Sequence, residues 1–442
     1  MKKLAVALAC ACASSSVAQV GSYLGPGILS PGAGNIGQRS GAPVDLRFYA
    51  DVTGIYDSGL EPFEVNSKGD LVTVNGLYGV QLDYGLYGVH SWRQAVLGLD
   101  FTGNFYHYDN DSQLDGTTQN LMLGFTYQKT RRLVFDFREV AGTSSLGYGA
   151  PGFYGVEGGP GSVVSQPTAL LFDNRVYYDQ SSVDVTFLES ARTSFTFGGT
   201  GLLVRRQASG LAGTNGYNGH GTIQHRLSRT QTIGLQYEYL HFEFPPAYGQ
   251  SSSNIAQAFF ASSLGRHWTY SIFAGAFETN AIGLQQVALS PVIAALLGTS
   301  VGIQRFNRTD VYPSGQATLT GHLKNSSLSF GYGEMVVPGN GVYLTSRQNS
   351  GSAGYSYTGI RKWNFGISAG YYKLASIGQG IPTYGQFSAG AGVTYMLPHA
   401  FHLTARYDAR HQDIDEAGYR RTGYRAAVGI AFSPGRVPLS LW

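Results

Sequence analysis

The chain has 442 residues and a formal net charge of +3, and only 13% of its residues are charged, about half the share of a typical soluble domain. The near balance of 30 basic and 27 acidic residues excludes a nucleic-acid binder, which would carry a basic patch. Abundant glycine (61) and tyrosine (30) fit a membrane protein, a soluble β-sandwich or a fibrous protein, so composition leaves these three classes open.

The N-terminus predicts a cleavable secretory signal peptide over residues 1–18. Lys2 and Lys3 are cationic, residues 4–13 are apolar, and Ser16-Val17-Ala18 offers the small residues of a cleavage site. A membrane anchor needs about 20 apolar residues, and Ser14 ends this run too early.

Both cysteines, Cys10 and Cys12, lie inside the predicted signal peptide. The mature chain is therefore expected to contain neither disulfides nor thiolate chemistry. Residues 19–43 are rich in Gly, Pro and Ser without any period, which predicts an irregular segment ahead of the folded domain.

From Val44 the sequence alternates between apolar and polar residues with the period of a β-strand. Val44, Leu46 and Phe48 form the apolar set, and Asp45 and Arg47 belong to the polar set. The same alternation recurs in residues 95–105, 132–138, 363–372, 401–410 and 424–432.

Eight short polar turns, most of them with Arg or Lys, punctuate these strands at intervals of about 37–39 or about 60 residues. One strand up, one loop, one strand down and one tight turn need about that many residues when each strand crosses a bilayer with roughly 9–11 of them. We therefore predict an all-β fold, a single transmembrane antiparallel β-barrel of 18 strands over residues 44–442, with 16 strands as the alternative. The turns lie near Ser91–Arg93, Thr130–Arg132, Ala191–Thr193, Ser228–Thr230, Arg266–Trp268, Lys324–Ser326, Arg361–Trp363 and Pro398–Ala400.

The two faces of the strands predict opposite environments. One face carries essentially no charge at the strand centres, where Arg or Lys facing lipid would cost about 2–4 kcal/mol. The other face mixes Gly, Ser, Thr and Asn with charges of both signs, as a water-filled lumen requires. The predicted pore-lining charges are Arg47, Asp51, Asp100, Asp136, Arg138, Glu238, Arg406, Asp408, Arg410 and Arg425.

Two long loops, residues 142–172 and 279–310, are candidates for plugging the lumen, as are residues 21–43. The second loop holds the apolar stretch 287–297, which Pro291 interrupts and which is too short to span a bilayer as a helix. We expect this stretch to fold into the barrel mouth. The alternative is an apolar outer patch that contacts a partner.

All four tryptophans fall at the turn side, where amphipathic indoles concentrate at a membrane interface. This predicts short turns on the periplasmic side and long loops outside. The interface residues are Trp92, Trp268, Trp363 and Trp442.

With these features the chain resembles Gram-negative outer-membrane β-barrel proteins of the porin-like kind: a cleavable signal, short turns, long outer loops, alternating strands and the aromatic C-terminal residue Trp442. The resemblance covers residues 44–442, is architectural and identifies no subfamily. It implies an outer-membrane location, contact with outer-membrane lipid and recognition by the barrel-assembly machinery. One departure is that the last alternating strand ends at Phe432, before Ser433-Pro434-Gly435 and a short tail.

No residue pattern predicts catalysis, a metal site or a cofactor. Asp109, Asp111 and Asp115 resemble an acidic calcium loop but lack the glycine and glutamate expected at later positions, so we interpret them as a solvated loop. The cluster of Asp413, Asp415 and Glu416 receives the same interpretation. The histidines are scattered over different strands, and no enzyme is expected.

The first functional hypothesis is an outer-membrane channel for passive diffusion of small hydrophilic solutes with weak charge selectivity. The alternatives are a plugged barrel that imports one substrate class, such as hydrophobic compounds, and a surface barrel whose loops bind glycans or cells. Whether the chain forms a homo-oligomer stays open. At the closing seam, Asp45 or Asp51 is expected to pair with Arg425, leaving Arg406 and Arg410 freer to face the water.

Overall fold

The computed structural model describes residues 44–58, 64–65, 71–72, 76–109, 115–145, 175–414 and 419–433. Its main strands are β1 (Val44–Asp57), β4 (Leu77–Ser91), β5 (Ala95–Tyr108), β6 (Gly116–Gln128), β7 (Leu133–Ser145), β8 (Arg175–Leu188), β9 (Thr193–Arg206), β10 (Thr214–Arg226), β11 (Gln231–Glu243), β12 (Gln250–Leu264), β13 (Trp268–Ala288), β14 (Val301–His322), β15 (Ser326–Val337), β16 (Ser346–Tyr357), β17 (Trp363–Ser376), β18 (Tyr384–Met396), β19 (Phe401–Ile414) and β20 (Tyr419–Phe432). A separate pair, β2 (Glu64–Val65) and β3 (Leu71–Val72), lies between β1 and β4 in the chain.

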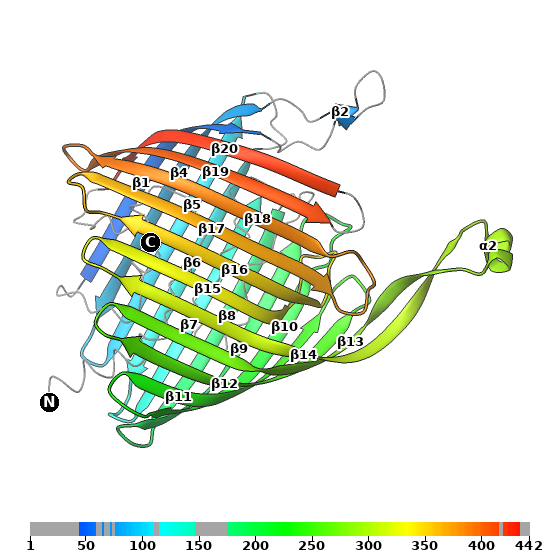
Figure 1. Ribbon diagram of the computed structural model, residues 1–442, viewed down its shortest axis with the longest axis horizontal. Coiled ribbons are helices and arrows are strands. Elements are labelled where there is room, and N and C mark those ends of the chain that lie inside the picture. The colour runs from blue at the N-terminus through cyan, green and yellow to red at the C-terminus, as the bar shows by residue number, and fades with distance from the viewer. Residues whose placement is uncertain are drawn as a thin grey trace.

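These 18 main strands form one closed antiparallel ring (Figure 1). β1 pairs with β4 on one side and with β20 on the other, and each remaining strand pairs with its neighbours in sequence. Closure gives every main strand a partner on both sides over at least part of its length, so the wall satisfies its backbone hydrogen bonds wherever these strands pair. The prediction of an 18-stranded barrel is confirmed, and the 16-strand alternative is wrong.

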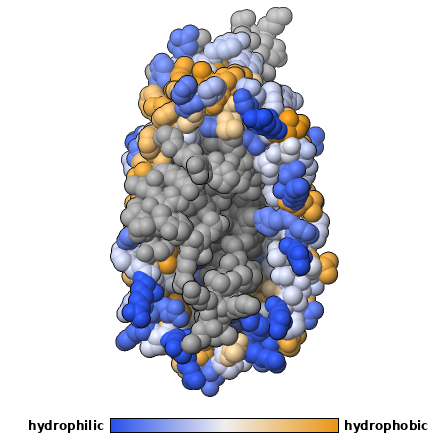
Figure 2. Space-filling view, turned by 90° about the vertical axis from the view of Figure 1, so that its left-hand side faces the viewer, coloured by the Kyte–Doolittle hydropathy of each residue, from blue (hydrophilic) through white to orange (hydrophobic). Residues whose placement is uncertain are grey.

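All eight predicted turns join consecutive strands at the same end of the ring, which we call the turn end; the opposite end is the loop end. Short polar side chains stabilise these turns, because a hydroxyl can accept hydrogen bonds from backbone amides that have no partner in the strands. The Ser190 hydroxyl, for example, accepts from the amides of Arg192 and Thr193 at 3.1 and 3.0 Å. Seen from the turn end, hydrophilic side chains are spread around the rim (Figure 2).

The predicted alternation also holds in the folded chain. On β1, Phe48 and Val52 are 51% and 54% exposed, whereas Asp51 and Thr53 are 2% and 7% exposed. Since successive side chains of a strand point to opposite faces, the apolar set covers the outside of the ring and the polar set faces inward.

One part of the outward face differs from the sequence expectation. Glu139 shares its parity with Phe135 and Phe137, so this carboxylate lies on the outside of β7 near the middle of the strand. The Ser181 hydroxyl donates to it at 2.6 Å from the directly opposed position on β8. The expectation that strand centres carry no outward charge is therefore wrong here, because this hydrogen bond partly compensates the carboxylate.

The hairpin of β13 and β14 extends well beyond the wall (Figure 1). These strands stay paired up to Ala288 and Val301, but β12 accompanies β13 only as far as Ile282. The short helix α2 (Pro291–Leu297) caps the projecting ribbon. The prediction that the apolar stretch 287–297 folds into the barrel mouth is wrong, because continued strand pairing keeps the ribbon regular and carries its tip outward. No helix among the described residues is long and apolar enough to cross a membrane.

Several predictions concern segments outside the described residues. These are the signal peptide 1–18, the Gly/Pro-rich residues 19–43, most of the loop 142–172 and the C-terminal Trp442. They stay predictions.

Candidate functional site

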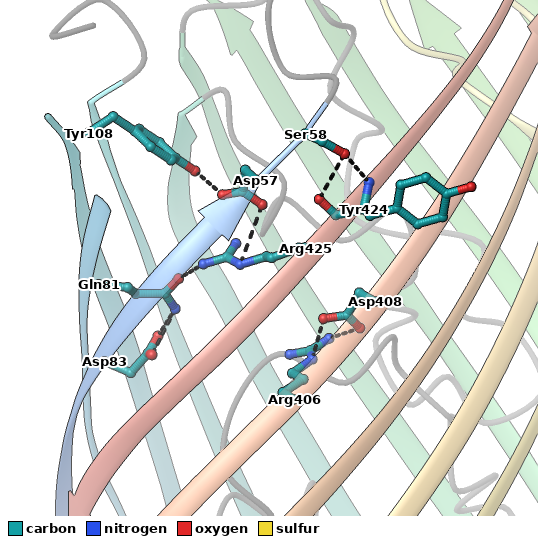
Figure 3. A network of polar contacts seen from close by, with 9 residues as sticks. All are labelled: Asp57, Ser58, Gln81, Asp83, Tyr108, Arg406, Asp408, Tyr424 and Arg425. Carbon is teal, nitrogen blue, oxygen red and sulfur yellow. Dashed lines mark hydrogen bonds and ion pairs between the residues drawn. The ribbon is translucent and has the colours of Figure 1, made fainter. Parts of the chain in front are cut away.

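The inner face of the ring carries a charged network where β20 closes onto β1 (Figure 3). Arg425 lies directly opposite Asp57, with its Nε 3.7 Å from Asp57 Oδ1. The Tyr108 hydroxyl donates to Asp57 Oδ2 at 2.5 Å, so both carboxylate oxygens face a donor. Asp57 is fully buried and Arg425 nearly so, and such a charge needs its partner nearby.

The network continues onto β4. Arg425 also donates to the side-chain oxygen of Gln81, whose amide nitrogen donates to Asp83 at 2.6 Å. Asp83 lies directly opposite Asp51, which accepts from the Thr53 hydroxyl at 3.0 Å. Three acidic groups and one guanidinium are thus distributed over β1, β4 and β20.

The predicted partner of Arg425 is therefore wrong: neither Asp45 nor Asp51 but Asp57 faces it. Asp51 is opposite Ala431, six positions along β1 from Asp57. Parity placed all three aspartates on the inner face, but the register across the seam decides which one meets the arginine.

On β19, Arg406 and Asp408 form a two-pronged ion pair. The Arg406 Nε lies 2.5 Å from one carboxylate oxygen, and a terminal nitrogen donates to the other at 2.6 Å. The expectation that Arg406 is free to face the water is wrong, because its neighbour two residues along the same face engages it. Arg410 lies on the same inner face one step further toward the loop end.

A second group of charges crosses the wall from β7 to β11. Asp136 is directly opposite Asp184, and His220 is directly opposite Glu238. His220 Nε2 reaches Asp184 Oδ1 at 3.0 Å across the intervening strand β9, at the position of Gly198. A Cβ on Gly198 would lie 1.8 Å from that oxygen, so this contact requires glycine.

The two charged groups face each other across the ring. Counted along the strand pairings, β10 and β19 are nine strands apart in either direction. The group around His220 is mainly acidic, with Asp136, Asp184 and Glu238, and Arg138 lies beside Asp136. The group on β19 and β20 holds three arginines together with Asp408, and Asp51, Asp57 and Asp83 adjoin it on β1 and β4. Charges of both signs therefore line the seam side of the inner face.

The loop end is narrowed by the end of the β15–β16 hairpin, residues 335–346. Val336 is fully buried in an apolar cluster with inner-face residues of β7 to β13, including Leu240 and Phe277. The Gly341 carbonyl accepts from the Ala212 amide at 3.0 Å, in the loop between β9 and β10. The hairpin end therefore crosses inside the ring to the other wall.

This inward fold separates β15 from β14. Their pairing ends at Gly315 and Glu334, although both strands continue toward the loop end. Above that point side chains replace hydrogen bonds: the Arg347 guanidinium of β16 lies 5.1 Å from the centre of the Tyr312 ring of β14. Arg347 also lies 3.7 Å from Glu334.

Two details hold the crossing loop in shape. Gly341 has φ 94°, and a Cβ there would lie 2.8 Å from the Arg206 Nε. The Tyr343 hydroxyl donates to the Pro382 carbonyl at 2.6 Å. Burial, together with the neighbouring Tyr384, raises the pKa of Tyr343 to about 12, so the hydroxyl keeps its proton and donates at neutral pH.

Sequence reasoning found part of this arrangement. The predicted pore-lining residues lie on inward-facing strand positions, although the side chain of Arg47 lies outside what the structure describes. It missed Asp57, Asp83, Asp184 and His220 and the crossing hairpin. Extending the parity of β1 four residues past Thr53 would have found Asp57, whereas nothing local marks residues 335–346 as turning inward.

No family model matches the chain, and no curated protein matches it. Solved structures similar to it include OccK2 (OpdF) of Pseudomonas aeruginosa, with 10% identity, 88% of this chain and 99% of that chain covered, and a TM-score of 0.43. OpdL of Pseudomonas aeruginosa is 12% identical to this chain, with 88% of this chain and 99% of that chain covered and a TM-score of 0.41. OccAB3 of Acinetobacter baumannii is 10% identical, with 88% of this chain and 99% of that chain covered and a TM-score of 0.38. At these identities the likeness concerns the fold alone. The closed 18-stranded ring, with its apolar outside and its short turns gathered at one end, has the architecture of a porin-like outer-membrane β-barrel.

Proposed function

We propose that the protein is an outer-membrane channel through which small hydrophilic solutes diffuse passively. The observation that carries this proposal is the charged inner face of a closed ring, with the mainly acidic group on β7–β11 opposite the network of both signs on β1, β4, β19 and β20. A ring of this size encloses a lumen wide enough for water and solutes. Charges that line a pore bias which ions and solutes pass.

Selectivity in this proposal is weak. Arg406 and Asp408 neutralise each other, as do Arg425 and Asp57, so the field at the wall comes from pairs rather than from a ladder of one sign. The pore-lining residues are those predicted from parity, joined by Asp57, Asp83 and Asp184. No catalytic role, metal or cofactor is part of the proposal.

The crossing β15–β16 hairpin end forms the constriction in this proposal. It supports a narrowed mouth rather than a wide one, because residues from both sides of the ring meet there. The tryptophans Trp92, Trp268 and Trp363 would anchor the turn end at the membrane interface, since indoles favour that boundary. This orientation puts the loop end outside the cell.

The decisive experiment is single-channel recording of the purified barrel in a planar bilayer, with a salt gradient across it. We expect stepwise conductance and a reversal potential that shows a small preference for one ion sign. A folded barrel that stays silent at every voltage would remove the proposal. Uniform conductance with no dependence on charge substitutions at β19 would remove the assigned role of the inner-face charges.

A further inference from the structure

The ribbon formed by β13 and β14 carries an uncharged, water-exposed tip. No residue between Glu278 and Arg305 is charged. At the end of the ribbon, Val292 and Leu296 of α2 are 71% and 80% exposed, and Ile303 of β14 is 74% exposed. Apolar exposure of this extent marks a surface that is covered in use.

The exposed side chains of the helix at the tip cover more than half of its circumference rather than a narrow stripe. Pro291, Val292, Ile293, Ala295 and Leu296 are exposed, although they point in different directions around the helix axis. A protein partner would cover one side of so short a helix and leave the other apolar side chains in water. A helix whose exposed side chains are all apolar is at home in a protein core or in a membrane.

Several backbone groups of the tip find hydrogen-bond partners within the tip. The Ser290 hydroxyl caps the helix start by accepting from the Ile293 amide at 3.5 Å, and the Gly298 amide donates to the Ala294 carbonyl at 2.9 Å. The Leu289 amide donates to the Ser300 carbonyl at 2.9 Å. Such internal hydrogen bonds lower the cost of placing this backbone in hydrocarbon.

The dimensions of the tip match one leaflet. The two uncharged residue pairs of the ribbon next to the helix are Val287 with Gly302 and Ala288 with Val301. Their length along the ribbon and the helix diameter add up to about 15–17 Å, which is half of a hydrocarbon core of about 30 Å. Below these two pairs, Gln286 is paired with Ile303, and Gln285 is paired with Gln304. Next comes Arg305, whose guanidinium lies 5.8 Å from the centre of the Tyr248 ring. Arginine and tyrosine are residues that settle at headgroup level.

From these observations we propose that the tip of the β13–β14 ribbon inserts into one leaflet of a lipid bilayer that faces the loop end of the barrel. The ribbon rises beyond the loop end, so this bilayer is a second one, not the one that holds the barrel (Figure 1). Because the tip is uncharged, insertion needs no particular headgroup, and a phosphatidylcholine surface suffices. This inference is independent of whether the barrel conducts solutes.

The test uses the full chain in a lipid nanodisc, mixed with phosphatidylcholine vesicles and separated by flotation. We expect the wild type to float with the vesicles and Val292→Glu/Leu296→Glu to float at least tenfold less. The matched control is Leu323→Glu/Ile360→Glu, which changes side chains that are 49% and 51% exposed at the turn end and out of reach of the second bilayer. Equal flotation of the tip variant and the wild type, or an equal loss in the control, would overturn the proposal.

A polarity-sensitive dye gives the second readout. The only cysteines, Cys10 and Cys12, lie in the predicted signal peptide, so Leu296→Cys and Arg308→Cys each provide a single labelling site in the mature chain. We expect a blue shift at position 296 only after vesicles are added, and none at position 308. A shift without vesicles overturns the proposal: one that grows with protein concentration assigns the tip to a second copy, and one that does not assigns it to the barrel's own bilayer.

Discussion

Removing the guanidinium of Arg425 should destabilise the barrel by about 3 kcal/mol. Breaking a buried ion pair by deleting one partner costs about 3–5 kcal/mol, because the remaining charge stays buried without compensation. Asp57 is 0% exposed, so Arg425→Met leaves a carboxylate with no access to water. The Tyr108 hydroxyl still donates to one of its oxygens at 2.5 Å, which puts the expected loss at the lower end of that range.

A second variant removes both charges of the pair. Asp57→Asn/Arg425→Gln removes both charges and keeps the polar contacts, so we expect it to lose about 1 kcal/mol and to recover about 2 kcal/mol relative to Arg425→Met. The assay is urea unfolding of the barrel in lipid vesicles, followed by tryptophan fluorescence and by the mobility difference between heated and unheated protein on gels. If Arg425→Met is as stable as the double variant, Asp57 and Arg425 do not stabilise the seam as a buried pair.

Three further substitutions test the inner face, the constriction and the outward face. Arg406→Glu should shift the reversal potential toward cation preference while the barrel still folds, because two carboxylates then replace the neutral pair of Arg406 and Asp408. If this variant fails to insert into the membrane, the assignment of inward- and outward-facing residues on β19 is wrong. Gly341→Val should raise single-channel conductance by driving the crossing loop off Arg206, which a Cβ would approach to 2.8 Å; unchanged conductance would remove this loop as the constriction. Glu139→Leu should stabilise the barrel against urea by about 1 kcal/mol by removing an outward carboxylate, and a loss of stability would mean that another protein surface covers Glu139.

The ring itself could be predicted from sequence because alternation is a local property. Within a few residues of each strand, the alternation of apolar and polar side chains shows which side chains face outward and which face inward. The polar turns mark where the chain reverses. Eight turns at one end require 18 strands when both ends of the barrel segment lie at that end, which the structure confirms.

The contacts within the site could not be predicted in the same way. Which aspartate meets Arg425 depends on the register of the closing seam, and that register depends on the stagger accumulated around the whole ring. Parity allows Asp45, Asp51 and Asp57 equally, yet only Asp57 is opposite the arginine.

The two hairpins that leave the wall escaped prediction for a related reason. Residues 279–310 keep their strand pattern, and nothing in that pattern says where the strands on either side stop. At the end of β15, Val336 has the outward parity of Tyr332, which is 51% exposed, but Val336 is fully buried because the hairpin bends inward there. Such departures depend on partners far away in the chain.

The ring contains two seams of eight residue pairs each, between β14 and β15 and between β20 and β1. Cutting at both leaves two continuous lengths of chain, residues 44–322 and 326–432, and each of them is an unbroken sheet. The turn at Lys324 and Asn325 is therefore where this barrel can be divided into two separately made fragments with the fewest backbone hydrogen bonds to re-form. The inward bend of the β15–β16 hairpin shortens one of these two seams, and the closing strand pair β20–β1 supplies the other.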